Sequence, residues 1–287
     1  MKNLITRTVT GILFVAAVVC SIVFYGNCSF FFYILFLAFT LVGTWELLQM
    51  VEKIGGTPLS MIPLLLSALV FSIPFLCELS LSGENPYLLL KSFACGVGMA
   101  FLLFVPLVFI LELFRYTKQP LGNVAVGFLP MLWVALPFSL ISSWVIMGES
   151  AVAVSFFVII WLNDTLAYCS GRLFGKHKLC ERISPKKTIE GFAIALVLTI
   201  ALSLVFPAIP FFAVQSFTSP LHWGGFAAVV VLAGTLGDLV ESMFKRQCGV
   251  KDSGKILPGH GGVLDRFDSS LLAAPVAFVY WLLVSVL

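Results

Sequence analysis

Nine apolar stretches, each long enough to cross a bilayer as a helix, constrain the fold of this chain more than any other feature. The hydrocarbon core of a bilayer is about 30 Å thick, and roughly 20 helical residues cross it. In lipid, an α-helix satisfies its backbone hydrogen bonds within one segment. We therefore predict an all-α fold, a polytopic membrane helical bundle with about nine transmembrane helices. The expected spans are residues 6–25, 29–50, 59–81, 87–114, 121–147, 151–170, 190–213, 221–244 and 268–287.

The composition excludes an ordinary soluble domain. Hydrophobic residues make up 60% of the 287 residues and charged residues 11%, whereas about a quarter of the residues in soluble domains are charged. The mean hydropathy is +1.07. The seven cysteines form no C-x-x-C pair, so we expect neither a disulfide framework nor a zinc site.

The placement of Lys and Arg predicts the orientation of the spans. With nine spans and a cytoplasmic N-terminus, every Lys and Arg except Lys91 falls on the cytoplasmic side, and Glu78, Glu84 and Glu149 fall on the opposite side. This asymmetry follows the positive-inside rule. We therefore expect the N-terminus to be cytoplasmic and the C-terminus to lie outside.

The longest polar stretches are the loops at about 171–189 and 245–267, and this orientation makes both of them cytoplasmic. The sequence shows no internal repeat and no linker. We therefore expect a single membrane-embedded domain over residues 1–287, with its catalytic half at about 151–287.

Polar residues interrupt the apolar spans at two places. Asn163 and Asp164 interrupt the sixth span. At the end of the eighth span, Asp238, Glu241 and Lys245 share one helical face, together with Gly234 and Ser242. A carboxylate in hydrocarbon costs several kcal/mol unless it has a partner or lines a wet cavity. The spacing therefore predicts a polar site at the cytoplasmic ends of these helices.

These residue types suit phosphate chemistry with a metal ion. Carboxylates bind Mg²⁺, which completes its coordination shell with water and substrate phosphates, and Lys and Arg neutralise the remaining phosphate oxygens. The glycines of "PGHGG" permit a turn whose backbone amides approach a polyphosphate. Asp265 and Asp268 share a face if a helix begins there. From the residues alone we infer phosphoryl or nucleotidyl chemistry on a membrane substrate.

Two blocks of the sequence resemble the CDP-diacylglycerol synthases, also called phosphatidate cytidylyltransferases. The first is "SMFKRQCGVKDSGKILPGHGGVLDRFD", residues 242–268, which fills every fixed position of the family signature. The second comprises "NDTLAYCSGRLFGKHKL" and "SPKKTIEG" within residues 161–191. In the amino-terminal half, Glu46 in "GTWELLQM" is the one family-like feature.

The resemblance implies an enzyme that transfers CMP from CTP to phosphatidic acid, giving CDP-diacylglycerol and pyrophosphate for phospholipid biosynthesis. It implies Mg²⁺ as a cofactor and leaves K⁺ open as a second cation. It also implies an inner (cytoplasmic) bacterial membrane location, with the active site at the cytoplasmic face. Family enzymes are described as dimers, so a homodimer is left open. No nucleic-acid partner is expected.

The resemblance also assigns roles to individual residues. The catalytic residues implied are Asp238, Asp265, Asp268 and Lys245, of which the three aspartates hold the metal. The substrate-binding residues implied are Ser184, Lys186, Lys187, Arg246, Lys251, Lys255, His260, Gly261, Arg266 and Asp164. Asp164 is either a further contributor to the metal site or the structural partner of a buried cation.

Other interpretations of the same residues stay open. A CTP-dependent lipid kinase of the dolichol kinase type would also be a multi-span protein, and a transporter would also carry acids within the membrane. Intact "KDSGKILPGHGGVLDRFD" argues against the kinase, and clustering of the charges at one face argues against the transporter. Glu241 can simply pair with Lys245, four residues on, and His260 can shape its loop without contacting a substrate.

Overall fold

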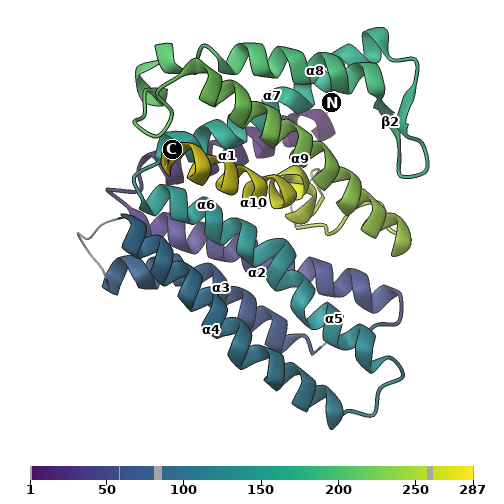
Figure 1. Ribbon diagram of the computed structural model, residues 1–287. Coiled ribbons are helices and arrows are strands. Elements are labelled where there is room, and N and C mark those ends of the chain that lie inside the picture. Colours follow the sequence, from purple (N-terminus) through teal and green to yellow (C-terminus); the bar gives the residue numbers. More distant parts are fainter. Residues whose placement is uncertain (1, 58, 81–85, 257–260, 287) are drawn as a thin grey trace. The chain divides into compact units, whose positions relative to one another are not determined.

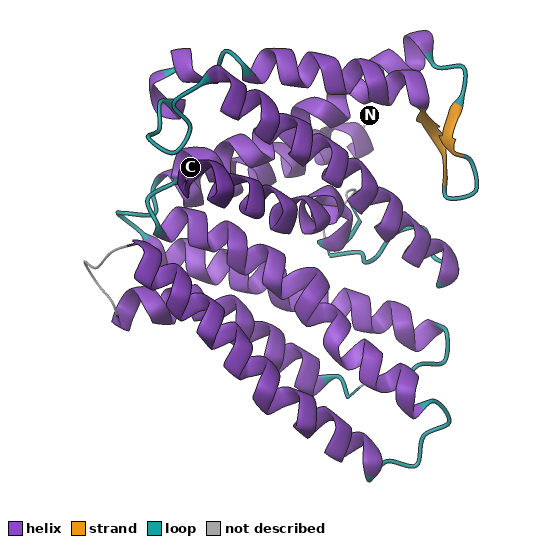
Figure 2. Cartoon of the chain, viewed as in Figure 1, coloured by secondary structure: helices purple, strands orange, loops and turns teal. Residues whose placement is uncertain are grey.

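The computed structural model describes residues 2–57, 59–80, 86–256 and 261–286. Contacts between residues divide the chain into two compact units. The first unit comprises Met1–Gly148 and Gln247–Arg266, and the second comprises Glu149–Arg246 and Phe267–Leu287. Most of the described chain is helical (Figures 1 and 2).

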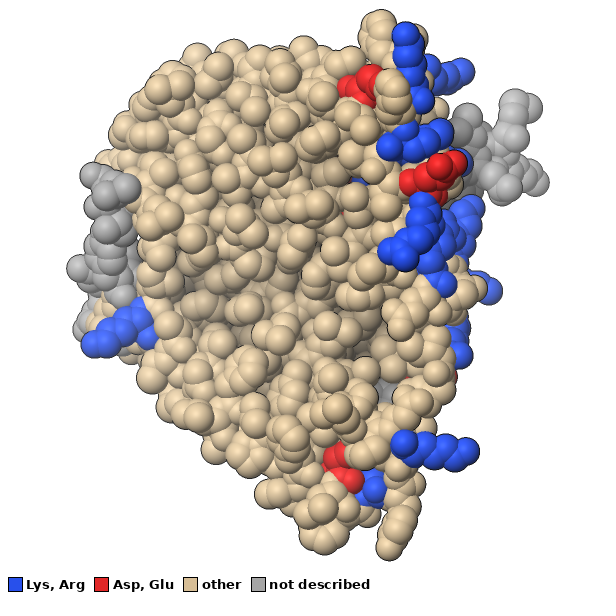
Figure 3. Space-filling view, turned by 45° about the vertical axis from the view of Figure 1, so that its right-hand side comes forward, with Lys and Arg blue, Asp and Glu red and all other residues tan. Residues whose placement is uncertain are grey.

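The helices confirm the predicted class of fold. Eight of the described helices are long and apolar enough to cross a membrane. The chain is therefore a polytopic helical membrane protein. Figure 3 shows the surface expected of such a protein, because Lys and Arg gather in clusters while large areas carry no charged side chain.

The first unit is a set of helices packed on aromatic side chains. Its elements are α1 (Lys2–Val23), α2 (Ser29–Lys53), α3 (Met61–Ser80), α4 (Pro86–Leu113), α5 (Pro120–Pro130), the π-helix η1 (Met131–Ala135) and α6 (Leu136–Ile146). Helices α2, α3 and α4 lie side by side (Figure 1). The buried ring of Phe36 lies between Phe32, at a centroid distance of 4.5 Å, and Phe138, at 5.8 Å.

Proline explains the irregular part of the fifth span. The sequence predicts kinks at Pro130 and Pro137, because proline lacks the N–H that continues the helical ladder. The helix departs from α geometry between them, where η1 follows directly after Pro130. The fourth span, in contrast, shows no break in its described residues: α4 is one helix from Pro86 to Leu113.

The second unit combines four long elements with a short hairpin. It contains α7 (Ser150–Phe174), β1 (Lys178–Cys180), β2 (Ser184–Thr188), α8 (Ile189–Ser203), the 3-10 turns η2 (Phe206–Ala208) and η3 (Pro210–Phe212), α9 (Pro220–Gln247) and all but the first turn of α10 (Leu264–Val286). The two strands are antiparallel and pair Lys178 with Thr188 and Cys180 with Ser184. Figure 2 shows them in orange, beyond the end of α7.

Two predicted boundaries are wrong, for identifiable reasons. The seventh span was expected to run to residue 213, but α8 ends at Ser203 and two 3-10 turns follow. Pro207 and Pro210 explain this, because proline disfavours helical geometry in the residue before it. Helix α10 begins at Leu264, four residues earlier than expected, so Asp265 and Asp268 both lie in the helix.

Candidate functional site

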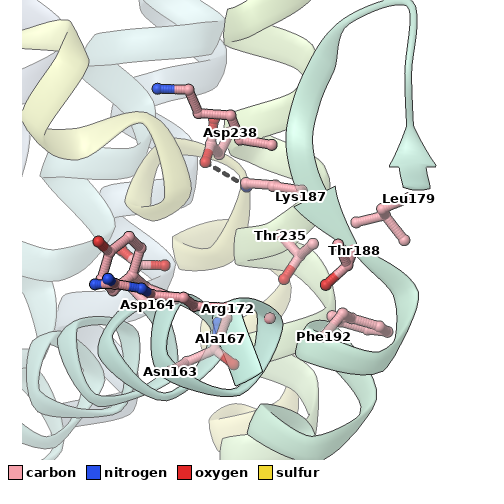
Figure 4. A pocket seen from close by; sticks show the side chains of 13 residues that line it. Asn163, Asp164, Ala167, Arg172, Leu179, Lys187, Thr188, Phe192, Thr235 and Asp238 are labelled. Atoms are coloured by element: carbon pink, nitrogen blue, oxygen red, sulfur yellow. Dashed lines mark ion pairs between the residues drawn. The ribbon is translucent and has the colours of Figure 1, made fainter. Parts of the chain in front are cut away.

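A pocket in the second unit contains several of the residues that the sequence predicts for the site. Its cavity of about 350 Å³ is lined by α7, both strands of the hairpin, α8 and α9 (Figure 4). Its charged lining residues are Asp164, Arg172, Lys186, Lys187 and Asp238, and its apolar lining includes Ala167, Leu179 and Phe192. Two acids, three bases and several apolar side chains therefore line one pocket.

Close packing of α7 against α8 forms one side of this pocket. A Cβ atom added at Gly191 would lie 2.8 Å from the Gly171 Cα atom and 2.9 Å from the Ala167 carbonyl oxygen. Thr188 caps α8, because its hydroxyl accepts a hydrogen bond from the Gly191 N–H at 3.2 Å. This cap joins β2 to α8 and so fixes the strand that carries Lys186 and Lys187.

The pocket contains an ion pair between two residues that the sequence assigned to different tasks. The Lys187 ammonium contacts the Asp238 carboxylate directly, as the dashed line in Figure 4 marks. Their side chains are 30% and 22% exposed. The second oxygen of Asp238 accepts a hydrogen bond from Ser242 Oγ at 3.2 Å. A residue predicted to bind phosphate is thus the counter-ion of a residue predicted to bind metal.

Further carboxylates crowd the same part of the second unit. Asp268 is half-buried and close enough to Asp238, Glu241 and Asp164 for electrostatic repulsion. One of its oxygens accepts the backbone N–H of Ser269 at 2.6 Å. Glu241 is fully buried and pairs with Lys245 at 2.5 Å, which confirms the pair expected from their four-residue spacing.

The acidic residues fit a magnesium ion. Among the described residues, no three Asp, Glu, His or Cys side chains are arranged to hold a metal. Mg²⁺ does not require such a cage, since it takes one or two carboxylates and keeps water and substrate phosphates as its other ligands. Asp238 and Asp268 supply hard oxygen donors of this type, and a divalent cation offsets the repulsion between them.

The first unit holds Asp265 in a separate hydrogen-bond network. Oδ2 of Asp265 accepts three hydrogen bonds, from Ser253 N at 2.9 Å, Ser253 Oγ at 3.0 Å and Gly262 N at 2.8 Å. Glu46, which the sequence marked only as family-like, contacts the same serine through a hydrogen bond of 3.1 Å. A carboxylate within an apolar span is the signal that singles out Glu46.

The structure places the remaining predicted residues outside the pocket lining. In the second unit, Ser184 lies in β2, Lys245 pairs with Glu241, and Arg246 Nε donates to the Ile183 carbonyl at 3.5 Å. In the first unit, Lys251, Lys255 and Arg266 are exposed, and Gly261 adopts a φ of +82°. His260 lies outside the described residues.

The left-handed backbone conformation of Gly261 places this residue directly beside the Asp265 carboxylate. A Cβ atom there would lie 2.6 Å from Oδ2 of Asp265, the oxygen that accepts the three hydrogen bonds. Glycine is therefore required both for the backbone angle and for the space beside the carboxylate. The predicted role of Gly261 in contacting a substrate stays a prediction.

Fold and site together define a polytopic helical membrane protein with a charged pocket beside its transmembrane helices. A model of the cytidylyltransferase family matches residues 5–284. The chain belongs to this family, which confirms the resemblance carried by its two sequence blocks.

Curated relatives carry a more specific name. The chain is 53% identical over 125 residues to a phosphatidate cytidylyltransferase of Staphylococcus epidermidis. It is 52% identical over 122 residues to that of Staphylococcus haemolyticus and 51% over 120 residues to that of Staphylococcus aureus. Each match covers 42% of this chain and 45% of the relative.

Proposed function

We propose that this protein is a phosphatidate cytidylyltransferase, which transfers CMP from CTP to phosphatidic acid and releases pyrophosphate. The pocket of the second unit is the observation that carries the proposal. It combines Asp238 and Asp164 with the cations Arg172, Lys186 and Lys187. Membership of the cytidylyltransferase family and the names of the relatives support the same reaction.

The reaction is a substitution at phosphorus. A phosphate oxygen of phosphatidic acid attacks the α-phosphorus of CTP, a new P–O–P bond forms, and the bond to the leaving pyrophosphate breaks. No side-chain nucleophile is needed, so the protein contributes positioning and charge. Mg²⁺ held by Asp238 and Asp268 would neutralise charge on the phosphates when bound. The assignment of Asp265 as a further metal ligand rests on the sequence resemblance.

The cations of the pocket have two tasks in this reaction. Arg172, Lys186 and Lys187 reduce the repulsion between two anionic substrates, and they orient the phosphates by charge-assisted hydrogen bonds. The apolar lining residues Ala167, Leu179 and Phe192 suit a substrate whose phosphate is attached to apolar chains. Phosphatidic acid has this amphipathic character.

Cofactor, location and partners follow as parts of the proposal. We assign Mg²⁺ as the metal, with K⁺ as an open second cation, and CTP and phosphatidic acid as the substrates. The site faces the cytoplasm of a bacterium, because the basic loops follow the positive-inside rule in a topology with a cytoplasmic N-terminus. A homodimer stays a prediction.

The test is product formation by the purified protein in detergent. Labelled CTP and phosphatidic acid are incubated with Mg²⁺ or with excess chelator, and lipid and nucleotide products are identified by mass spectrometry. We expect CDP-diacylglycerol and pyrophosphate only when Mg²⁺ is present. Release of CDP with a newly phosphorylated lipid would instead identify a CTP-dependent kinase, and product formation in chelator would contradict the role of the metal.

A further inference from the structure

A buried carboxylate of the amino-terminal half contacts the signature loop of the carboxyl-terminal half. Glu46 lies within α2, and the residue is 1% exposed. Its two oxygens accept hydrogen bonds from the backbone N–H groups of Val263 and Leu264, both at 3.0 Å. Val263 directly precedes α10 and Leu264 is its first residue, and the unpaired N–H groups at the start of a helix carry partial positive charge. Glu46 therefore provides hydrogen-bond acceptors for two backbone N–H groups at the start of this helix.

Ser253 connects Glu46 to Asp265. Its hydroxyl oxygen lies 3.1 Å from Oε2 of Glu46 and 3.0 Å from Oδ2 of Asp265. The Ser253 side chain is buried, and its backbone N–H also donates to Asp265. Two carboxylates thus share one hydroxyl group, and both contact the loop that precedes α10.

Two glycines of the first unit leave space for the Glu46 carboxylate. A Cβ atom added at Gly262 would lie 2.5 Å from both oxygens of Glu46, and one added at Gly254 would be closer still to Oε1. Both glycines belong to the signature stretch "KDSGKILPGHGG". A side chain at either position would collide with the Glu46 carboxylate.

We propose that Glu46 is a positioning residue for Asp265, the predicted metal ligand. It acts on Asp265 through Ser253 and through the first turn of α10, and it does not itself contact substrate. This inference rests on the proposed function, since it gives Asp265 the role that the family resemblance implies. Groups that orient a metal ligand typically change metal affinity by about 10–100-fold when they are replaced.

The first test is manganese binding to the purified full chain, measured by electron paramagnetic resonance, with the Glu46→Gln variant. Glutamine has a similar shape, but its amide N–H₂ group would face an N–H donor. We expect the affinity for Mn²⁺ to fall by about 10-fold or more, and kcat to fall with little change in the KM for CTP. Asp265→Asn gives the reference loss of affinity.

Glu112 provides a matched control for a purely structural role. It is 4% exposed, lies in the same unit, and accepts hydrogen bonds from Arg115 at 3.0 Å, Thr117 at 2.6 Å and Asn123 at 2.7 Å. Glu112→Gln should therefore lower the thermal stability without changing Mn²⁺ affinity. If Glu46→Gln does the same, the proposal is overturned.

A second variant tests the connection if Glu46→Gln fails to insert. Ser253→Ala removes the shared hydroxyl and leaves the bonds from Val263 and Leu264 to Glu46 in place. Wild-type Mn²⁺ affinity in this variant contradicts the inference, because the proposed connection from Glu46 to Asp265 passes through this hydroxyl. Mn²⁺ affinity is measured without turnover. If the wild-type protein makes no CDP-lipid, the proposed reaction is refuted, and the Mn²⁺ affinities of the variants still test the role of Glu46.

Discussion

Both oxygens of the Asp238 carboxylate are engaged, one by the Lys187 ammonium and the other by Ser242 Oγ. Asp238→Asn removes the charge and keeps the shape. We expect turnover to fall by about 100-fold or more, the scale seen when one preorganised electrostatic group is removed. Folding should be preserved, because Lys187 is 30% exposed and can be solvated. Steady-state kinetics and melting curves in detergent measure the two effects.

Glu181→Gln is the control for this prediction. Glu181 is an exposed acid of the same unit, at the tip of the hairpin, and it does not line the pocket among the described residues. Its neutral variant should keep wild-type turnover. Near-normal activity of Asp238→Asn would remove that residue from the metal site.

The buried pair of Glu241 and Lys245 leads to a prediction about stability. Their side chains are 1% and 12% exposed. Lys245→Met leaves a buried carboxylate without this partner, which should lower the free energy of unfolding by about 3–5 kcal/mol. The double variant Glu241→Leu/Lys245→Met should recover most of the loss. Denaturation in detergent checks both, and a single variant as stable as wild type would show that the pair is dispensable.

Sequence periodicity could predict contacts within one helix but not contacts between distant segments. The pair of Glu241 and Lys245 follows from their four-residue spacing. The contact between Lys187 and Asp238 joins a hairpin to a helix, and no spacing rule indicates it. The bonds of Glu46 to Val263 and Leu264 cross more than 200 residues of sequence, so only the folded chain reveals them.

At the level of elements, the contact between α7 and α8 depends on having no side chain at Gly191. In Gly191→Ala, the new Cβ atom would meet Gly171 and the Ala167 carbonyl, which are backbone atoms that cannot move aside. We expect a loss of about 1–3 kcal/mol in stability and weaker substrate binding, because α7 and β2 line the pocket. Gly98→Ala is the control, since open space surrounds its Cβ position in α4. Equal melting temperatures for the two variants would contradict this account.

Long apolar helices were predictable and short polar elements were not. A run of roughly 20 apolar residues has one stable structure in lipid, which is a helix. The hairpin of Lys178–Cys180 and Ser184–Thr188 was expected only as a loop. Its strands are short and rich in Lys, and their sequences do not show the alternation of apolar and polar residues that indicates a strand. Their pairing is also irregular.

For the whole molecule, the distribution of basic residues predicts which connections face the cytoplasm. Reporter fusions after Lys118 and Arg182 should behave as cytoplasmic, and a fusion after Gly148 should behave as external. A fluorescent protein that folds only in the cytoplasm and a phosphatase that is active only outside provide the two readouts. Opposite results at Lys118 and Arg182 would show that the number of spans between them is wrong.

The number of helices and the family could be predicted at this scale, whereas the division into two units could not. Hydropathy describes each helix separately and says nothing about which helices pack together. The first unit includes Gln247–Arg266, which is far in sequence from the rest of that unit. The expectation of a single domain with a catalytic half at about 151–287 stays a prediction.

The bonds between Glu46 and α10 have a consequence for biosynthesis. Glu46 is synthesised 217 residues before Val263, a delay of roughly 10–40 s at typical translation rates of about 5–20 residues per second. Throughout this interval the Glu46 carboxylate of α2 lacks the N–H groups of Val263 and Leu264, which have not yet been synthesised. A chain that stops before Val263 lacks both of these donors, so the hydrogen bonds of Glu46 to Val263 and Leu264 form only after synthesis has reached α10.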